Sequence, residues 1–349
     1  MAHFLLLTGS LLTGLLQGIG LAPHPDWNLE PILTRQESAR PPADSFAARP
    51  AVQRFIRTMA SEHPLAVDDL ERWFGEIRSR EDIIALISRP AEKTLSWGEY
   101  RKIFLDQPRI DNGAAFWRRH RETLQKAEQE YGVPAQVVVA ILGVETRYGK
   151  VTGHHGVLEA LATLAFDYPP RADFFRRELE KFLLLTREEN MDPLAPKGSY
   201  AGAMGLAQFM PSSFLAYAVD FDDDGQRDIW HNPVDAIGSI ANYLSEHRWR
   251  RGAPVSVPAS VEGSGYRRYL SGGLEPPSAS VALLRRNGVQ ATRTVDDQQQ
   301  AFLLELSTAG GAEYWLGFYN FYVITRYNRS PLYAMAVHQL GEAISDHVR

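Results

Sequence analysis

A glutamate placed within an otherwise apolar helix constrains this chain more than any other feature. Glu145 lies in the run Val137–Gly149, whose sequence is Val-Val-Val-Ala-Ile-Leu-Gly-Val-Glu-Thr-Arg-Tyr-Gly. Pro134 can open a helix there as its first residue, and Gly149 can close it. At helical spacing the carboxyl group shares one stripe with three aliphatic side chains. These are Val138, Ile141 and Leu142.

Such a position has a chemical interpretation and a structural one. A carboxylate is rarely placed on an apolar face unless it is paired or its protonated form is wanted. Desolvation would disfavour the anion, raise the pKa of Glu145 and keep a proton available for donation near neutral pH. The alternative is a purely structural glutamate paired with Arg147 or Arg118. Position alone leaves both interpretations open.

Length and composition limit the class of protein. A chain of 349 residues suggests two domains or one large core with insertions. The formal net charge of −5, with no block of Lys or Arg, argues against a general nucleic-acid binder. Cysteine is absent, which excludes a disulfide scaffold, a thiol nucleophile, a cysteine-based zinc site and a lipidated N-terminal cysteine.

The N-terminal region predicts export. Residues 1–22 form an apolar stretch of signal-peptide length, although no Lys or Arg precedes Arg35. An uncleaved anchor or a docked apolar helix is the alternative. Residues 23–50 are rich in proline and unpatterned, so we expect a linker. No other segment is long and apolar enough to span a bilayer.

The rest of the chain predicts a mainly α fold with a small β-containing part. We expect a helical domain over 51–110 and a core over 111–250 and 313–349. Residues 251–312 are rich in Gly, Ser and Pro with short β-branched runs, and read as a small insertion. Within it, the segment Phe302–Leu306 is the expected strand.

Several helix ends are also predicted. Asp111 and Asn112 can cap a long helix that ends at Gly132. A helix over 232–247 would have Asn232 as N-cap and Pro233 at its first position. The chain returns to helix after Ser330 and Pro331.

Three long motifs follow one another along the chain. They are Val144–Gly149, Gly202–Ser213 and Asn320–Asn328, with Tyr100–Phe104 as a further match. Together they resemble the membrane-bound lytic murein transglycosylase B family of bacterial cell-wall enzymes. The resemblance runs from about Phe55 to the C-terminus.

The resemblance implies a lysozyme-like core flanked by a helical domain and a small β domain. Members cleave the β-1,4 bond between N-acetylmuramic acid and N-acetylglucosamine in peptidoglycan. The C6 hydroxyl of the muramic acid replaces water and leaves a 1,6-anhydro end. The family's single catalytic carboxylate maps onto Glu145, which would act as acid and then as base. No cofactor for catalysis is implied.

The resemblance also implies residues that bind the substrate. Gln208 would lie beside the catalytic acid, although a buried Gln that satisfies loop backbone is the alternative. Ser199 has a turn role as its alternative. Arg171 resembles a position near the stem peptide, but Pro170 stands where the family often has another arginine. The remaining residues of this expected set are Tyr322, Tyr327, Asn328 and Phe209.

An acidic loop over 220–235 predicts a structural Ca²⁺ site. Asp220, Asp222 and Asp224, followed by Gly225, match the first half of an EF-hand. Position 12 is His231, so a later carboxylate must complete the site, either Asp228 or Asp235. The resemblance favours Asp235, because the family has a lengthened loop. In the separate Gly202–Ser213 motif, Gly202 and Gly205 are expected to serve backbone conformation. The expected ligand set is Asp220, Asp222, Asp224, Gln226 and Asp235.

These observations predict a periplasmic lytic transglycosylase. The expected partners are peptidoglycan glycan strands and other cell-wall enzymes, with no nucleic acid, and the chain is expected to be a monomer. Two rival functions stay open. One is a muramidase that admits water at the same bond, and the other is a non-catalytic scaffold that binds peptidoglycan.

Overall fold

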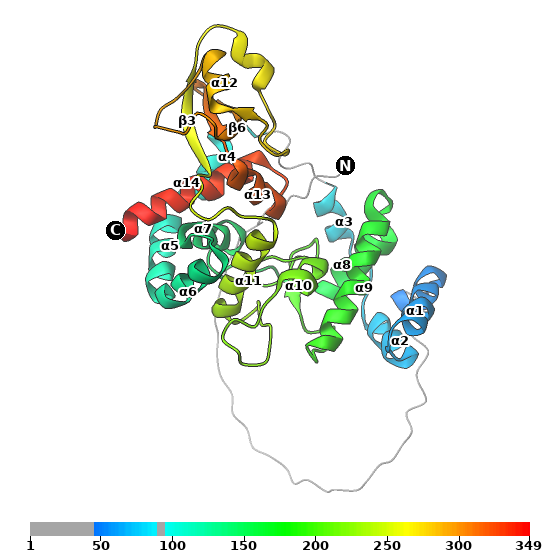
Figure 1. Ribbon diagram of the computed structural model, residues 1–349. Coiled ribbons are helices and arrows are strands. Elements are labelled where there is room, and N and C mark those ends of the chain that lie inside the picture. The colour runs from blue at the N-terminus through cyan, green and yellow to red at the C-terminus, as the bar shows by residue number, and fades with distance from the viewer. Residues whose placement is uncertain (1–44, 89–94) are drawn as a thin grey trace, which may run out of the picture. The chain divides into compact units, whose positions relative to one another are not determined.

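The structure is a computed structural model that describes residues 45–88 and 95–349 (Figure 1). The chain divides into two compact units, with the boundary between Arg78 and Ser79. The expected signal peptide at 1–22, and the expected linker up to residue 44, lie outside the described residues. Among the helices that the structure describes, none has the length and apolar character needed to cross a membrane.

The described part of the smaller unit is helical. It contains η1 (Phe46–Ala48), α1 (Pro50–Glu62) and α2 (Val67–Glu76). The last residues of the expected linker therefore form η1 and the start of α1. This unit ends at Arg78, whereas we expected a helical domain that runs to residue 110.

The larger unit is built around α7 (Ala135–Thr146), which packs against α5, α6, α11 and α14. Residues 137–146 of this helix are all buried, so the expected stripe is part of a helix enclosed on every side. The other helices and two short strands of this part are α3 (Glu81–Ile87), α4 (Trp97–Phe104), α5 (Gln107–Arg119), α6 (Arg121–Tyr131), β1 (His155–Gly156), α8 (Val157–Asp167), η2 (Pro169–Arg171), α9 (Ala172–Glu188), β2 (Lys197–Gly198), α10 (Pro211–Tyr217), α11 (Pro233–Glu246), α13 (Tyr319–Tyr327) and α14 (Pro331–Val348).

The ends of α7 differ from those expected. Pro134 is the N-cap and not the first helical residue, and the helix ends at Thr146 and not at Gly149. The backbone turns left-handed at Arg147 (φ 50°), and the Tyr148 N–H donates to the Leu142 carbonyl at 3.0 Å. Two consecutive left-handed residues, Arg147 and Tyr148 (φ 62°), thus end the helix ahead of Gly149.

The expected start at Asp111 and Asn112 is wrong, because both residues lie inside α5. Asp106 caps that helix, and its side chain accepts from the Arg109 N–H at 2.8 Å. The predicted stop at Gly132 is confirmed by its left-handed φ of 74°. The Asn232 side chain accepts from the Val234 N–H, which confirms that cap. The sequence did not distinguish α13 as a helix of its own.

The β-containing part is a five-stranded antiparallel sheet in the order β4-β6-β7-β3-β5. The predicted strand Phe302–Leu306 lies inside β6, and the sheet extends to residue 317, beyond the expected boundary at 312. Its elements are β3 (Ser256–Val261), η3 (Gly265–Tyr269), β4 (Ala279–Ser280), α12 (Val281–Arg286), β5 (Val289–Ala291), β6 (Gln300–Thr308) and β7 (Gly311–Gly317).

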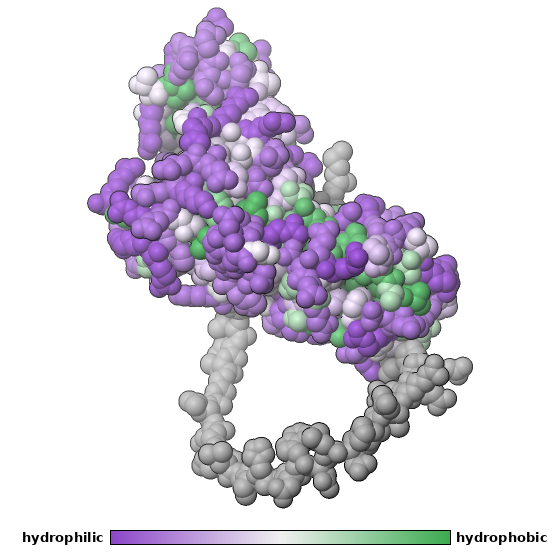
Figure 2. All heavy atoms as spheres, turned by 60° about the horizontal axis from the view of Figure 1, so that its bottom comes forward, coloured by the Kyte–Doolittle hydropathy of each residue, from purple (hydrophilic) through white to green (hydrophobic). Residues whose placement is uncertain are grey.

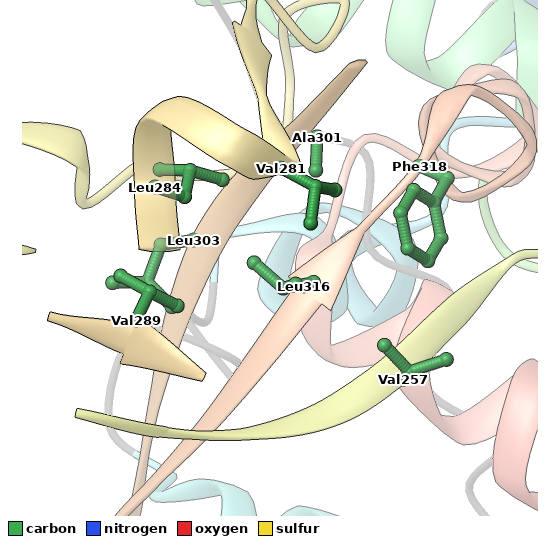
Figure 3. Packing of buried hydrophobic residues seen from close by; sticks show 8 residues of the cluster. All are labelled: Val257, Val281, Leu284, Val289, Ala301, Leu303, Leu316 and Phe318. Atoms are coloured by element: carbon green, nitrogen blue, oxygen red, sulfur yellow. The ribbon is translucent and has the colours of Figure 1, made fainter. Parts of the chain in front are cut away.

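This sheet has an apolar core of its own. Side chains from β3, β5, β6 and β7 meet those of α12 and of Phe318, the residue directly after β7, in one cluster (Figure 3). Its buried members are Val257, Val281, Leu284, Val289, Ala301, Leu303, Leu316 and Phe318. On the face of the molecule in Figure 2, hydrophobic residues form only scattered patches on a mostly hydrophilic surface.

A buried histidine on α14 links stability to pH. The His338 side chain is 10% exposed, and its ring lies edge-on to the Trp315 ring with 6.2 Å between centroids. Burial, followed by the charge of Arg293, lowers the pKa of His338 to about 4. The hydrogen bond to the Ser256 backbone opposes this shift, and the Glu342 carboxylate 3.6 Å away does not outweigh it.

We predict that the free energy of unfolding falls as the pH drops from about 6.5 towards 4. Over that window the unfolded chain binds the His338 proton before the folded chain does. Complete protonation would cost roughly 3 kcal/mol. Denaturant titrations from pH 7 to pH 4 should show a shallower decline for His338→Phe than for the wild type. His231→Phe, at a side chain that is 87% exposed, is the control. Equal declines for wild type and His338→Phe would contradict this account.

Candidate active site

A cleft of about 240 Å³ opens beside the C-terminal end of α7. Its walls come from α7, the first half of α9, the start of α10 with the turn before it, α11, and α13 with the turn that follows it. The lining residues are Glu145, Phe174, Glu178, Gln208, Phe209, Met210, Ser212, Ser213, Tyr243, Arg326, Tyr327, Asn328 and Arg329. The cleft therefore brings together segments that are far apart in the sequence.

Glu145 projects from the last turn of α7 into this cleft. The residue is only 6% exposed. The Tyr333 hydroxyl, from the first turn of α14, donates to Glu145 Oε1 at 2.6 Å. This hydrogen bond fixes the direction of the carboxyl group and offsets part of the cost of burying it. The predicted burial of Glu145 is thus confirmed, and a tyrosine hydroxyl is its partner.

Two phenol side chains stand beside the carboxyl group, of which Tyr333 is buried and Tyr327 is half-buried. The Tyr327 and Tyr333 rings are nearly parallel, with 6.5 Å between centroids. Burial, followed by the charge of Glu145, raises the pKa of both hydroxyls well above the ordinary value. Both therefore stay protonated at neutral pH and act as donors. Tyr333 donates to Glu145, and Tyr327 donates to the Ala207 carbonyl at 2.5 Å.

The Gly202–Phe209 segment presents Gln208 to the cleft in a fixed orientation. Gln208 has a left-handed φ of 50°, and its Nε2 donates to the carbonyls of Thr152 (3.1 Å) and Gly205 (2.8 Å). Both amide protons are thereby used, so the side-chain oxygen remains as the acceptor. At Gly205 a Cβ would lie 2.4 Å from the Ile229 carbonyl oxygen, and its φ is 65°. The expected backbone role of this glycine is confirmed.

Asn328 adds a second acceptor. The residue lines the cleft, and its Oδ1 is buried with no hydrogen-bond partner among the described residues. A buried acceptor left without a partner costs free energy until a ligand or water supplies a donor. Asn328 and Gln208 thus both suit a ligand that carries O–H or N–H groups.

Glu178 is a second carboxyl group in the cleft wall. It lies on α9 and is 5% exposed. Its two oxygens accept from the Ser212 N–H (2.9 Å) and the Ser212 hydroxyl (2.7 Å). Burial raises the pKa of Glu178, and the hydrogen bonds from Ser212 oppose that shift. These contacts tie α9 to the first turn of α10, directly after the turn that carries Gln208.

Three expected binding residues are not among those that line the cleft. The Ser199 hydroxyl accepts from the N–H groups of Ala201 (3.3 Å) and Ala203 (3.0 Å), which is the turn role given as its alternative. Arg171 stacks on Phe174, which does line the cleft, with 4.3 Å from the guanidinium carbon to the ring centroid. Tyr322 lies on α13 beside Arg326.

The sequence reasoning missed Tyr333, Tyr243 and Glu178. Tyr333 follows the Ser330 cap in a helix of apolar residues, a pattern that by itself indicates only packing. A buried tyrosine hydroxyl usually finds a hydrogen-bond partner, and that requirement is the signal that could have raised the question. Glu178 offered a similar clue, as a carboxylate within the buried pattern of α9.

The acidic loop brings three of the expected metal ligands together. Side-chain oxygens of Asp220, Asp222 and Asp235 all lie within 4.8 Å of one another. Asp235 is fully buried, and its oxygens accept from the N–H groups of Phe221 and Asp228, both at 2.8 Å. Burial, and then the charges of Asp222 and Asp220, raise the pKa of Asp235 to about 6.

The other residues of the loop have local roles. The Asp224 carboxylate accepts from the Gln226 N–H at 2.9 Å. The Asp228 carboxylate accepts from the N–H groups of Trp230 and His231, so it closes a turn. Of the two carboxylates considered for completing the site, Asp235 is the one that joins the group.

Comparison with known proteins identifies the family. A family model described as the transglycosylase SLT domain matches residues 47–342. The chain belongs to this family, and it is an enzyme of the lytic transglycosylase class. The expected mainly α, lysozyme-like fold with a small β part is confirmed by its structural relatives.

The similar proteins cover most of this chain. The membrane-bound lytic murein transglycosylase B of Escherichia coli K12 is 42% identical over 323 residues, which is 90% of this chain and 88% of that protein. The soluble lytic transglycosylase SltB1 of Pseudomonas aeruginosa is 49% identical with a TM-score of 0.81, covering 85% of this chain and 99% of that one. The lytic transglycosylase SLT35 of Escherichia coli in complex with bulgecin A is 42% identical with a TM-score of 0.80, covering 88% and 97%.

We predict that Tyr333→Phe lowers the turnover number about 10- to 100-fold, because a hydrogen bond to a charged group is worth about 1.5–3 kcal/mol. The measurement is the initial rate of release of soluble fragments from purified peptidoglycan. Tyr131→Phe, on α6 and outside the cleft lining, is the matched control. An unchanged turnover number in a folded Tyr333→Phe protein would show that Glu145 does not need this partner.

Proposed function

We propose that this enzyme cleaves the β-1,4 bond between N-acetylmuramic acid and N-acetylglucosamine and leaves a 1,6-anhydro end. The observation that carries the proposal is a buried glutamate in a cleft, held by a tyrosine hydroxyl. The family and the names of its relatives, among them a lytic murein transglycosylase, support peptidoglycan as the substrate.

Glu145 first acts as the general acid. Tyr333 donates to Oε1, so the transferable proton of the acid form resides on Oε2. Glu145 gives this proton to the glycosidic oxygen as the bond to the anomeric carbon breaks, and the N-acetylglucosamine leaves as an alcohol. The resulting carboxylate then removes the proton of the muramic acid C6 hydroxyl while that oxygen bonds to the anomeric carbon. The proton returns to Glu145, and no water is consumed.

The cleft suits an N-acetylated sugar. Such sugars carry hydroxyl and acetamido N–H donors, and Gln208 and Asn328 offer acceptor oxygens to them. Tyr327, which is half-buried, adds ring surface that can pack against the apolar face of a pyranose. Phe209 is only 2% exposed and packs against the Tyr327 ring, with 5.9 Å between centroids. We assign Gln208, Tyr327 and Asn328 to substrate binding, and Phe209 to support of the Tyr327 ring.

A water-consuming muramidase is the alternative, and Glu178 is the observation that bears on it. Glycosidases that admit water commonly use a second carboxylate as base or nucleophile. Both oxygens of Glu178 already accept hydrogen bonds from Ser212. We therefore assign Glu178 to holding the start of α10, and expect the reaction to proceed without it as base.

We predict that Glu145→Gln lowers the rate on purified sacculi by about 10²- to 10⁴-fold or more. The products of the wild type, analysed by mass spectrometry after digestion in heavy-oxygen water, should be anhydro-muropeptides that are one water lighter and carry no label. Glu122→Gln, on the exposed side of α6, is the control.

Three results would contradict the proposed reaction or the role of Glu145. Labelled reducing ends would establish the muramidase. Full activity of Glu145→Gln would remove the assignment of the acid. Binding to sacculi without any product from the wild type would favour the non-catalytic scaffold.

We also propose that the enzyme acts in the periplasm after export. The substrate assigned above lies outside the cytoplasmic membrane, and the apolar segment at 1–22 has signal-peptide length. Other enzymes of wall remodelling are the proposed protein partners.

The acidic loop is proposed to hold a structural Ca²⁺ ion. Three carboxylates converge there, and burial, followed by the charges of Asp222 and Asp220, raises the pKa of Asp235. A divalent cation would stabilise the ionised carboxylates against both effects. A related structure, also of SLT35 from Escherichia coli, is of a complex with calcium. Asp220, Asp222 and Asp235 are the proposed ligands, with Asp224 and Gln226 as further candidates from the EF-hand pattern.

We predict that Ca²⁺ raises the melting temperature of the wild type but not of Asp235→Asn. A ligand that binds only the folded state at 100 times its Kd adds about 2.7 kcal/mol. Thermal unfolding with Ca²⁺, and with Mg²⁺ for comparison, measures this directly. Asp296→Asn, at an exposed acid of the β-containing part, serves as control. An equal shift in Asp235→Asn and wild type would exclude the site.

A further inference from the structure

Two tyrosines of α13, flanked by one arginine on each side, form a row of side chains that reaches the cleft. Tyr319, Tyr322 and Arg326 follow at i, i+3 and i+7, so they share one face of this helix. The Arg326 guanidinium carbon lies 4.4 Å from the Tyr322 ring centroid, and that of Arg250 lies 3.7 Å from the Tyr319 centroid. The two tyrosine rings are 5.7 Å apart. We call Arg250, Tyr319, Tyr322 and Arg326 the α13 strip.

The strip is held in place by buried hydrogen bonds. Asn320 is fully buried, and its Oδ1 accepts from the Arg250 N–H at 2.8 Å. Its Nδ2 donates to the carbonyls of Arg250 and Ala253, both at 2.9 Å. At the other end, Arg326 Nη2 donates to the Leu274 carbonyl at 3.0 Å. These bonds fix the Arg250 backbone and the Arg326 guanidinium group, which lowers the entropic cost of binding a ligand there.

The strip carries positive charge that the protein does not neutralise. Within the described ranges, neither Arg250 nor Arg326 has a carboxylate oxygen within 4.0 Å of its guanidinium group. Arg250 is exposed, whereas Tyr319, Tyr322 and Arg326 are half-buried. Arg329, also exposed, lines the adjoining end of the cleft. This surface suits a ligand with anionic groups next to rings of moderate polarity.

Resting on the proposed function, we propose that the α13 strip binds the peptidoglycan strand just outside the cleavage site. Arg326 belongs to both the cleft and the strip, so a strand that lies in one continues onto the other. Sugar rings lie against Tyr319 and Tyr322, and Arg250 and Arg326 bind carboxylates of the stem peptides, which match the planar guanidinium. Tyr322, expected to bind substrate, thus does so outside the cleft.

The test uses the full chain with Glu145→Gln as a background that binds without cutting. Dissociation constants are measured for solubilised glycan strands that carry stem peptides, and for strands stripped of peptides by an amidase. Adding Arg250→Ala or Tyr319→Ala should weaken binding of peptide-bearing strands about threefold to tenfold, and Arg250→Glu should weaken it further. On stripped strands the effect of Arg250→Ala should vanish, whereas that of Tyr319→Ala should persist. Arg268→Ala, at an exposed arginine of η3, is the control.

The outcomes separate this proposal from the proposed function. If wild type forms anhydro products while Arg250→Ala and Tyr319→Ala bind as the background does, the strip alone is refuted. If Arg250→Ala weakens binding of both kinds of strand equally, its assignment to stem-peptide carboxylates is wrong. If the background binds no strand, the strip proposal is overturned, whereas the products of the wild type alone decide the proposed function. Thermal unfolding reports whether Tyr319→Ala still folds, and if it does not, Arg250→Glu decides.

Discussion

A carboxyl group can lie on a helix buried on every side only if other buried groups meet it, and the hydroxyl of Tyr333 does so here at 2.6 Å. That single hydrogen bond joins the last turn of α7 to the first turn of α14. It requires α14 to begin where it does, which the Ser330 cap ensures by accepting from the Tyr333 N–H. It also requires a phenol that remains protonated, which burial provides.

Further hydrogen bonds fix the residues around this carboxyl group. Tyr327 stacks parallel to Tyr333 and donates to the Ala207 carbonyl, so the orientation of one phenol is tied to the segment that carries Gln208. Directly after that segment, Ser212 at the start of α10 donates two hydrogen bonds to Glu178, and these bonds hold the end of the segment in place. Polar groups that would be costly if left unpaired thus fix the cleft wall, and they leave acceptor oxygens of Gln208 and Asn328 for a ligand.

What the sequence could predict was local or carried by long motifs. Glu145 was found because a charged residue interrupts an apolar run, and Asn232 because a cap and a following proline are adjacent in sequence. Tyr333 was missed because its partner lies 188 residues away, and no local pattern encodes that pairing. The start of α5 was misplaced because Asp106 and Asp111 are equally good caps by type, and only packing chooses between them. Ser199 shows the converse, since the resemblance implied a binding role while its hydroxyl accepts hydrogen bonds from its own turn.

The separation of Glu145 from Tyr333 along the chain has a consequence for when this enzyme can act. During synthesis from the N-terminus, α7 is complete long before α14 exists, and Arg326, Tyr327 and Asn328 are also among the last residues made. The cleft wall formed by α13 is therefore made late, and Glu145 lacks the Tyr333 hydroxyl until α14 docks. A folded core that ended before α14 would hold the acid without the hydroxyl that orients it.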